Sequence, residues 1–307
     1  MQKAPPTPKG FRDINPTFAK KRRKIINGII YVLEENNFEP IETPTIEFAQ
    51  TLTGKYGEEE RLIYKFQDRG GRDLALRYDL TVPLARYVGT NIPPLPFRRY
   101  QIGQVFRGEN PQAGRWREFT QLDFDTVGST DTFDDANFIA TAINAAKKIG
   151  IANPTMLVND RQNFEKTPID IIRAIDKLHK IGEESVKVEL KSKNMALDDI
   201  EDHLYKIKNA KPTANLMEIF NILKEKYKLA ENKDFIFDPT LARGLDYYTG
   251  SIFELKPSSN PADLTIGSGG RYDNLIGLFV HPDKGGAKKD IPAVGFSFGI
   301  DRIVDLI

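Results

Sequence analysis

The chain has 307 residues, of which 40% are hydrophobic and 28% are charged. These fractions are typical of a globular protein with a packed core, and they exclude extensive disorder. At roughly 100 to 200 residues per domain, the length indicates two domains or one enzyme-sized domain with an insertion. The net charge is only +1, so a polyanion would have to be bound by a local cluster of cations.

Cysteine is absent, and the histidines are His179, His203 and His281. The lack of cysteine excludes thiol nucleophiles, disulfides and cysteine-ligated zinc. Because the histidines are far apart in sequence, we expect no metal site and no histidine-dependent nucleophile. No stretch approaches the roughly 18 apolar residues that span a bilayer, and the first ten residues lack the apolar region of a signal peptide. These features predict a cytoplasmic protein whose chemistry is carried by Arg, Asp, Tyr or Gln.

The first expected element is one long helix. Asn15 and Pro16 are typical of a helix start, and apolar residues then recur at helical spacing as far as Asn36. An extended run is expected over 40–48. Two hairpins follow, which pair 61–67 with 74–78 and 98–107 with 117–127 across polar loops that contain glycine.

The last of these strands alternates between two kinds of side chain. Leu122 and Phe124 point to one face, and the other face carries Arg117, Phe119, Gln121, Asp123 and Asp125. The first face therefore belongs to the core. The second is polar, and from this strand alone a solvated surface and a binding surface are equally compatible with it.

The rest of the chain is expected to return to the sheet after a helical segment. A helix is predicted over 131–148 and a short strand over 156–158, and a helical pattern rich in Lys and Glu fills 168–229. Strands resume at 235–237, 246–255 and 293–298. We therefore expect a first core part (1–160), a helical insertion (161–234) and a second core part (235–307). The hairpin connections predict an α+β fold on an antiparallel sheet.

Several short segments place arginine beside carboxylate or tyrosine. They are 77–81 (Arg-Tyr-Asp-Leu-Thr), 106–125, which opens with Phe-Arg-Gly-Glu, 241–248 (Leu-Ala-Arg-Gly-Leu-Asp-Tyr-Tyr), 269–273 (Gly-Gly-Arg-Tyr-Asp) and 295–302. Together they resemble the catalytic domain of the histidyl-tRNA synthetases, a family of class II aminoacyl-tRNA synthetases, over essentially the whole chain. The stretch around Pro44 is similar to motif 1 of that class, 107–121 to motif 2 and 293–302 to motif 3.

The resemblance implies an enzyme that activates L-histidine with ATP and transfers it to tRNA(His), with Mg²⁺ accompanying ATP and motif 1 forming a homodimer. It implies no membrane partner. Activation brings a carboxylate close to the α-phosphate, so two negative charges meet. Arginines can neutralise this negative charge, and their forked donors bind two oxygens at once. The catalytic residues implied are Arg107 and Arg243. The ATP-binding residues implied are Arg107, Glu109, Arg115, Phe119 and Arg302.

For the amino acid, the resemblance implies a pocket with acceptors for the ammonium and a polar group for the imidazole. Asp79, Thr81 and Gln121 would face the ammonium, Asp125 and Tyr248 the imidazole, and Tyr247 would close the pocket. Leu80, Arg107 and Arg243 complete the implied histidine site. Core packing is an equally compatible reading of Phe119, and strand packing of one of the two tyrosines.

The chain ends shortly after motif 3, where members of the family continue into an anticodon-binding domain. We therefore expect a catalytic core that forms the adenylate and charges tRNA weakly. The alternative is a non-catalytic histidine-binding paralogue of the kind that regulates ATP phosphoribosyltransferase. Such a paralogue is expected to lose its ATP arginines, so the presence of Arg107, Arg243 and Arg302 favours the enzyme. A third alternative is a class II synthetase that is specific for another amino acid.

Overall fold

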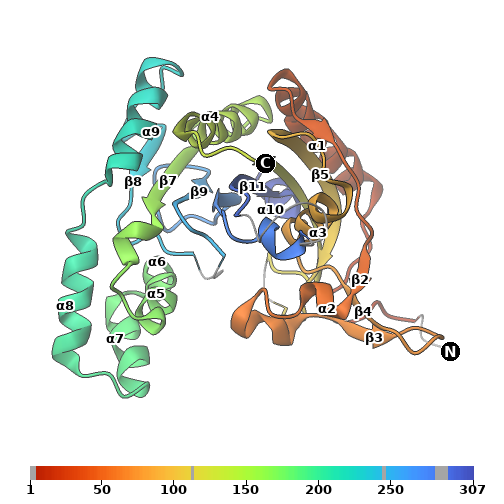
Figure 1. Ribbon diagram of the computed structural model, residues 1–307, viewed down its shortest axis with the longest axis horizontal. Coiled ribbons are helices and arrows are strands. Elements are labelled where there is room, and N and C mark those ends of the chain that lie inside the picture. Colours follow the sequence, from red (N-terminus) through yellow and green to blue (C-terminus); the bar gives the residue numbers. More distant parts are fainter. Residues whose placement is uncertain (1–4, 112–113, 244–246, 281–289) are drawn as a thin grey trace.

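The computed structural model describes residues 5–111, 114–243, 247–280 and 290–307 (Figure 1). Among these residues, eight strands form one sheet in the order β1-β5-β6-β11-β10-β9-β7-β8, and three form a smaller sheet in the order β2-β4-β3. The strands of the large sheet are β1 (Glu39–Pro40), β5 (Phe97–Phe106), β6 (Glu118–Val127), β7 (Thr155–Asp160), β8 (Phe235–Phe237), β9 (Ser251–Lys256), β10 (Gly267–Arg271) and β11 (Ala293–Gly299). The small sheet contains β2 (Ile46–Phe48), β3 (Lys65–Gln67) and β4 (Asp73–Leu76).

The α-helices described are α1 (Pro16–Glu35), α2 (Ala49–Leu52), α3 (Thr81–Asn91), α4 (Thr132–Lys148), α5 (Ile169–Ile175), α6 (Leu178–Ile181), α7 (Glu183–Ser192), α8 (Leu197–Lys208), α9 (Ala214–Glu225) and α10 (Ile300–Leu306). Short 3₁₀ turns cover Gly57–Leu62, Arg161–Phe164 and Ile276–Phe279. Within the described part of the chain, no helix has the length and apolar character that crossing a bilayer requires. The result is the predicted α+β architecture, in which the large sheet is mostly antiparallel and only its two outermost pairs, β1 with β5 and β7 with β8, are parallel.

Helix α1 begins and ends where the sequence predicts. The side chain of Asn15 accepts a hydrogen bond from the Phe18 backbone N–H, and Pro16 occupies the first helical position, where no N–H is needed. The helix buries one apolar stripe made of Ile25, Ile29, Val32 and Leu33. Burial of this stripe against the sheet stabilises the helix more than its intrinsic propensity does.

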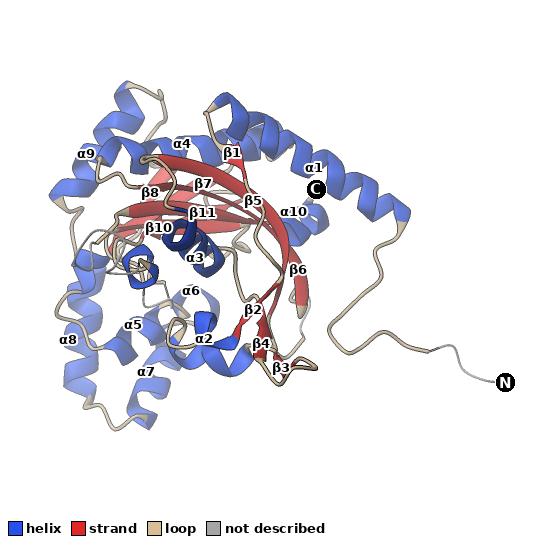
Figure 2. Cartoon of the chain, turned by 45° about the vertical axis from the view of Figure 1, so that its right-hand side comes forward, coloured by secondary structure: helices blue, strands red, loops and turns tan. Residues whose placement is uncertain are grey.

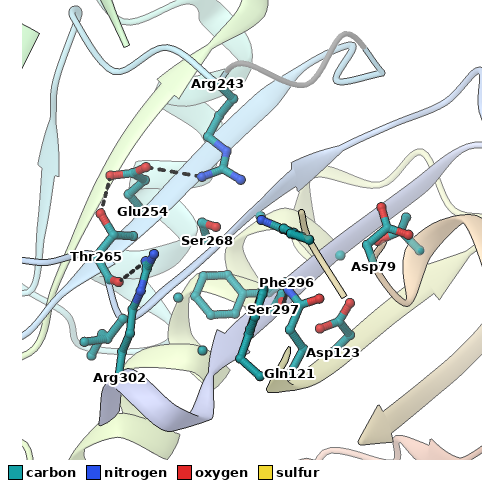
Figure 3. A pocket seen from close by; sticks show the side chains of 18 of the residues that line it. Asp79, Gln121, Asp123, Arg243, Glu254, Thr265, Ser268, Phe296, Ser297 and Arg302 are labelled. Atoms are coloured by element: carbon teal, nitrogen blue, oxygen red, sulfur yellow. Dashed lines mark hydrogen bonds and ion pairs between the residues drawn. The ribbon is translucent and has the colours of Figure 1, made fainter. Parts of the chain in front are cut away.

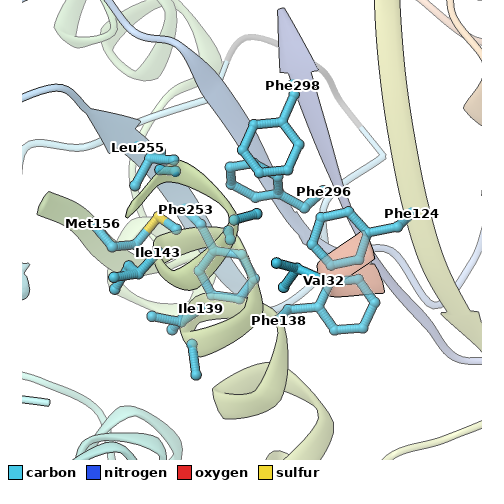
Figure 4. Packing of buried hydrophobic residues seen from close by; sticks show 14 of the residues in the cluster. Val32, Phe124, Phe138, Ile139, Ile143, Met156, Phe253, Leu255, Phe296 and Phe298 are labelled. Atoms are coloured by element: carbon cyan, nitrogen blue, oxygen red, sulfur yellow. The ribbon is translucent and has the colours of Figure 1, made fainter. Parts of the chain in front are cut away.

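The main core lies on the outer side of the curved sheet. Figure 2 shows α1 and α4 running along that side, with α3 on the inner side. Phe124 of β6 stacks on Phe138 of α4 with ring centroids 4.8 Å apart, and Phe296 and Phe298 of β11 extend the aromatic cluster (Figure 4). Each of these aromatic side chains buries a large apolar area, so the cluster stabilises the packing of α4 on the sheet.

The opposite face of β6 is polar, as its alternation predicts, but it is not solvated. Asp123 is 3% exposed and Asp125 is 2% exposed. Carboxylates are rarely this buried without a paired or functional role. Of the two readings of this face, the structure therefore excludes the solvated surface.

Three of the predicted extended segments differ from the structure by more than two residues. Arg61 and Leu62 belong to a 3₁₀ turn, so the first hairpin is the shorter pair β3 and β4. The extended run over 40–48 is divided between the two sheets. The strand predicted over 246–255 begins only at Ser251. Tyr247 to Gly250 are not part of a strand, and residue 246 lies outside the described residues.

Strand β10 escaped the sequence analysis altogether. Four of its five residues are Gly or Ser, which are poor strand formers and show no alternation. The close packing of the sheet requires glycine here: a Cβ on Gly269 would lie 2.1 Å from the Gly295 carbonyl oxygen. The smooth surface that results forms part of the floor of the cavity described below.

The helices between β7 and β8 pack in two groups. Helices α5, α7 and α8 share a separate apolar cluster with members such as Ile171, Val186 and Leu204, whereas α9 packs on α4 in the main core through Phe220 and its neighbours. The predicted division of the chain at 161 and 234 stays a prediction.

Candidate active site

A cavity of about 280 Å³ lies on the polar face of the large sheet. Twelve of the thirteen residues that the sequence analysis assigns to substrates line it: Asp79, Thr81, Arg107, Glu109, Arg115, Phe119, Gln121, Asp125, Arg243, Tyr247, Tyr248 and Arg302. Leu80 does not. Its side chain is fully buried, and its carbonyl oxygen accepts a hydrogen bond of 3.4 Å from Arg99 Nη2.

The two ends of the cavity differ in charge. Arg243 and Arg302 lie at one end with Glu254 and Thr265, whereas Asp79, Gln121 and Asp123 lie at the other (Figure 3). Segments far apart in sequence therefore meet to form one site with a cationic and an acidic end.

Arg107 is the first cation of the site and comes from the end of β5. Its guanidinium carbon lies 4.3 Å from the ring centroid of Tyr78 and 5.2 Å from that of Phe119. Burial would lower the pKa of Arg107, but Tyr78 and nearby carboxylates outweigh it and raise the pKa. The group is held as a fixed cation between two aromatic faces. Phe119 thus contacts both the cavity and an arginine, and core packing alone does not account for its position.

Arg243 is held by an ion pair with Glu254, at 3.2 Å between Nη1 and Oε1. The second carboxylate oxygen of Glu254 accepts a 2.9 Å hydrogen bond from the Thr265 hydroxyl and lies 3.3 Å from Lys256 Nζ. Burial opposes the charge of Arg243, but the rings and carboxylates around it raise its pKa. Its Nε finds no hydrogen-bond partner among the described residues, so this buried guanidinium keeps a donor available.

Arg302 comes from α10 and donates to the Thr265 carbonyl oxygen at 3.0 Å. Burial and the like charges of Arg115 and Arg107 lower its pKa. Cations that repel one another in a buried cavity indicate a site that is completed by an anion. At the mouth of this end, Arg115 forms an ion pair of 3.4 Å with Glu109.

The acidic end is built on a second set of buried contacts. Asp79 precedes α3, and its Oδ1 accepts hydrogen bonds of 3.0 Å from the Tyr56 hydroxyl and the Val82 N–H. Asp125 Oδ2 lies 2.6 Å from Arg99 Nη2, and its Oδ1 accepts a 2.5 Å hydrogen bond from the Tyr272 hydroxyl. Burial raises the pKa of both carboxyl groups.

Several residues of this site were not assigned from the sequence, among them Arg99, Asp123, Glu254 and Tyr272. Asp123 carried a usable signal, because strand alternation puts it on the same face as Gln121 and Asp125. Tyr272 stands within the Gly-Gly-Arg-Tyr-Asp segment. Nothing in the sequence marks Arg99 as a fully buried cation, since only its strand partner reveals the pairing.

Some predicted positions fall outside the described residues. Residues 244–246 complete the Leu-Ala-Arg-Gly-Leu-Asp-Tyr-Tyr segment, and 112–113 lie in the loop between β5 and β6. Within the described part of the chain, no group of three or more His, Asp or Glu could hold a metal ion.

Comparison with known proteins agrees with this geometry. The family model described as histidyl-tRNA synthetase matches residues 10–167 and 169–303. The histidine–tRNA ligase of Aeropyrum pernix is 41% identical over 98% of this chain and 74% of its own length. That of Korarchaeum cryptofilum is 39% identical over 97% of this chain and 74% of its own length. The histidyl-tRNA synthetase structure from Nostoc sp. PCC 7120 superposes with a TM-score of 0.81 at 27% identity, covering 99% of this chain and 75% of that one.

The antiparallel sheet with its helices and its arginine-lined cavity defines a class II aminoacyl-tRNA synthetase fold. Within that class, the chain belongs to the histidyl-tRNA synthetase family.

Proposed function

We propose that this protein is a histidine–tRNA ligase, which joins L-histidine to the α-phosphate of ATP, releases pyrophosphate and transfers the histidyl group to tRNA(His). The observation that carries the proposal is one cavity that is lined by three arginines from distant segments and has an acidic end. An amino acid carries an ammonium beside a carboxylate, and a triphosphate carries only negative charge. The two ends of the cavity therefore match the two substrates.

Arg107 and Arg243 are assigned to the reacting carboxylate and α-phosphate, and Arg302 to the terminal phosphates. The attacking carboxylate is already ionised near neutral pH, so the first step needs no general base. Its oxygen forms the new bond to phosphorus while the bond to pyrophosphate breaks, and negative charge accumulates between the arginines. Arg243 fits this role because its cation is fixed by Glu254 and keeps an unpaired Nε donor. Mg²⁺ would arrive with ATP as part of the substrate.

Phe119 is assigned to the adenine face, and Glu109, with Arg115 beside it, to the adenine edge. At the acidic end, Asp79, Thr81 and Gln121 are assigned to the ammonium. Asp125 and Tyr248 are assigned to the imidazole, with Tyr247 packed against Tyr248 at a centroid distance of 4.8 Å. A site built to pair buried polar groups rejects analogues that lack them by roughly 10⁴-fold in favourable cases.

The test is histidine-dependent exchange of pyrophosphate into ATP. Arg243→Ala should lower the exchange rate roughly 10²- to 10³-fold, as removal of a single charge-stabilising donor does elsewhere. Arg243→Lys should recover only part of the loss, because the forked geometry is gone. Arg69→Ala, which removes an exposed arginine in the β3–β4 turn, is the matched control and should leave the rate unchanged.

Other outcomes of the same assay decide between functions. Histidine binding without exchange would support the regulatory paralogue, and exchange driven better by another amino acid would point to a different specificity. Charging is measured separately with tRNA(His) transcripts.

A homodimer is proposed on the face of the small sheet. Ile46, Phe48 and Phe66 are 45%, 49% and 41% exposed there, and large apolar side chains gathered on one sheet are typical of an interface. This face adjoins the segment similar to motif 1. Sedimentation at micromolar concentration should show a dimer, and Phe48→Glu should dissociate it; a wild-type monomer would contradict the proposal. The cytoplasm is the compartment proposed, as the name of the Dictyostelium discoideum relative states for that protein.

A further inference from the structure

Asp123 is a buried carboxylate at the acidic end of the cavity to which no role has been assigned. It lies on β6 between Gln121 and Asp125, and the alternation of the strand puts all three side chains on the cavity face. Across the sheet it faces Gln101 of β5 and Ser297 of β11. Asp123 is buried, with 3% of its surface exposed, yet its Oδ1 has no hydrogen-bond partner among the described residues.

An unpaired buried oxygen is costly, and a folded protein rarely keeps one without a use. Three more acceptors of the same cavity are buried without a hydrogen-bond partner in the described part of the chain: Asp79 Oδ2, Gln121 Oε1 and Asp125 Oδ2. Of these, only Asp125 Oδ2 has a cation beside it, in the ion pair with Arg99. The amide nitrogen of Gln121 donates to the Ser297 hydroxyl at 2.8 Å, which leaves its oxygen directed elsewhere. The labelled side chains of Asp79, Gln121 and Asp123 gather at one end of the cavity in Figure 3.

The charges around Asp123 also leave room for a cation. Burial raises the pKa of Asp123 to about 7, Arg99 opposes this rise, and Asp125 and Asp79 add to it, while the Ser297 hydroxyl favours the ionised form. The charges of Arg99 and Arg77 both reach Asp123, but Arg99 forms the 2.6 Å ion pair with Asp125, and Arg77 donates to the Gln104 and Thr43 carbonyl oxygens. A further positive charge in contact with Asp123 would stabilise its ionised form.

A ligand that suits three unpaired acceptors must offer three N–H donors and a positive charge, and an alkylammonium group offers both. We propose that Asp123, in place of Thr81, binds the α-ammonium of the amino acid substrate as the third acceptor beside Asp79 and Gln121. The inference rests on the proposed function and adds to it a residue that recognises the substrate. Asp125 stays assigned to the imidazole. Its carboxylate is positioned by the ion pair with Arg99 and by the hydrogen bond from Tyr272.

The experiment compares ligands that keep or lack the ammonium. Histidine and histidinol carry it, whereas imidazolepropionate has the same ring and carboxylate without it. Binding of each to wild type and to Asp123→Asn is measured by calorimetry. The fluorescence of Trp116, the only tryptophan in the sequence and a residue that lines the cavity, gives a second signal.

Asp123→Asn should weaken histidine and histidinol about 10- to 100-fold, the loss typical of a hydrogen bond to a charged group. Its effect on imidazolepropionate should stay within twofold. Equal losses for all three ligands would overturn the proposal, because Asp123 would then act on the ring or on the shape of the pocket. Unchanged histidine binding would overturn it as well.

Two controls separate the possible failures. Asp134→Asn removes a carboxylate of α4 that lies outside the cavity lining and pairs with Arg98 at 3.1 Å, and it should leave histidine affinity unchanged. ATP affinity within twofold of wild type shows that Asp123→Asn is folded; if it is not, Asp123→Ser is compared in the same way. A wild-type protein that binds no histidine would refute the proposed function. If the wild type is active and Asp123→Asn binds histidine as tightly as wild type does, only this inference is refuted.

Discussion

Replacing Asp123 with asparagine should stabilise the ligand-free protein at alkaline pH even though it weakens substrate binding. Burial raises the pKa of Asp123 to about 7 in the folded protein, while in the unfolded chain an aspartate ionises near pH 3.9 (about its unperturbed value). Between these two values the folded state holds a proton that the unfolded state has released. Stability therefore falls as the pH rises through this window, and the cost persists above it.

The size of the effect follows from the width of the window. Each pH unit corresponds to about 1.36 kcal/mol, so a window of roughly three units costs about 4 kcal/mol at pH 8. About two pH units of this window lie above pH 5, which corresponds to about 2.7 kcal/mol between pH 5 and pH 8. At roughly 2.1 cal/mol/K per residue, the unfolding entropy of a chain of this length is about 0.6 kcal/mol/K. The melting temperature of Asp123→Asn relative to wild type should therefore rise by about 4 °C between pH 5 and pH 8.

The assay is calorimetric melting of both proteins at pH 5 and pH 8 without histidine. Asp134→Asn is the reference, because it breaks an ion pair with Arg98 and should lower the melting temperature. An Asp123→Asn protein that is less stable than wild type at pH 8, or one whose difference from wild type is the same at both pH values, would refute the reasoning. Saturating histidine should reduce the advantage of the variant, because its ammonium stabilises the ionised carboxylate.

Three further outcomes are expected. Gly295→Ala should weaken histidine binding at least 10-fold in calorimetry, because the new Cβ would lie 1.9 Å from Asp125 Oδ1, whereas Gly299→Ala meets no atom closer than 3.7 Å and should not. Phe124→Ala should lower the free energy of unfolding by about 3 to 5 kcal/mol in urea titrations, since its fully buried ring contacts four other phenylalanines. His179→Gln should destabilise the protein more at pH 6 than at pH 8. The hydrogen bond that His179 donates to Asp238 raises the pKa of His179, so its contribution is present at low pH and is lost as the pH rises through that pKa. Equal destabilisation at both pH values would contradict this last expectation.

Local sequence patterns were sufficient to predict those elements whose structure depends on residues close together in the chain. The start of α1 at Asn15 and Pro16 and the two faces of β6 could be predicted because capping and alternation depend on neighbours in sequence. The short arginine-containing segments likewise led to twelve residues that line one cavity. Their roles toward histidine and ATP stay predictions until the variants are measured.

The tertiary structure decided what depends on contacts between distant segments. Strand β10 has no readable pattern because glycine carries no side chain to alternate, and its place in the sheet appears only when Gly269 is seen against Gly295. Arg99 and Asp125 lie 26 positions apart in the chain and become an ion pair only through the register of β5 with β6.

The sequence by itself determined the class of fold, the polar face of β6 and the set of arginines, because periodicity and short motifs are local properties of the chain. Only the tertiary structure decided that this polar face is buried and that Arg99 lies beside both of its carboxylates. Burial and the pKa values that follow from it are set by what packs against a side chain, and for Asp123 those neighbours come from four separate segments of the protein.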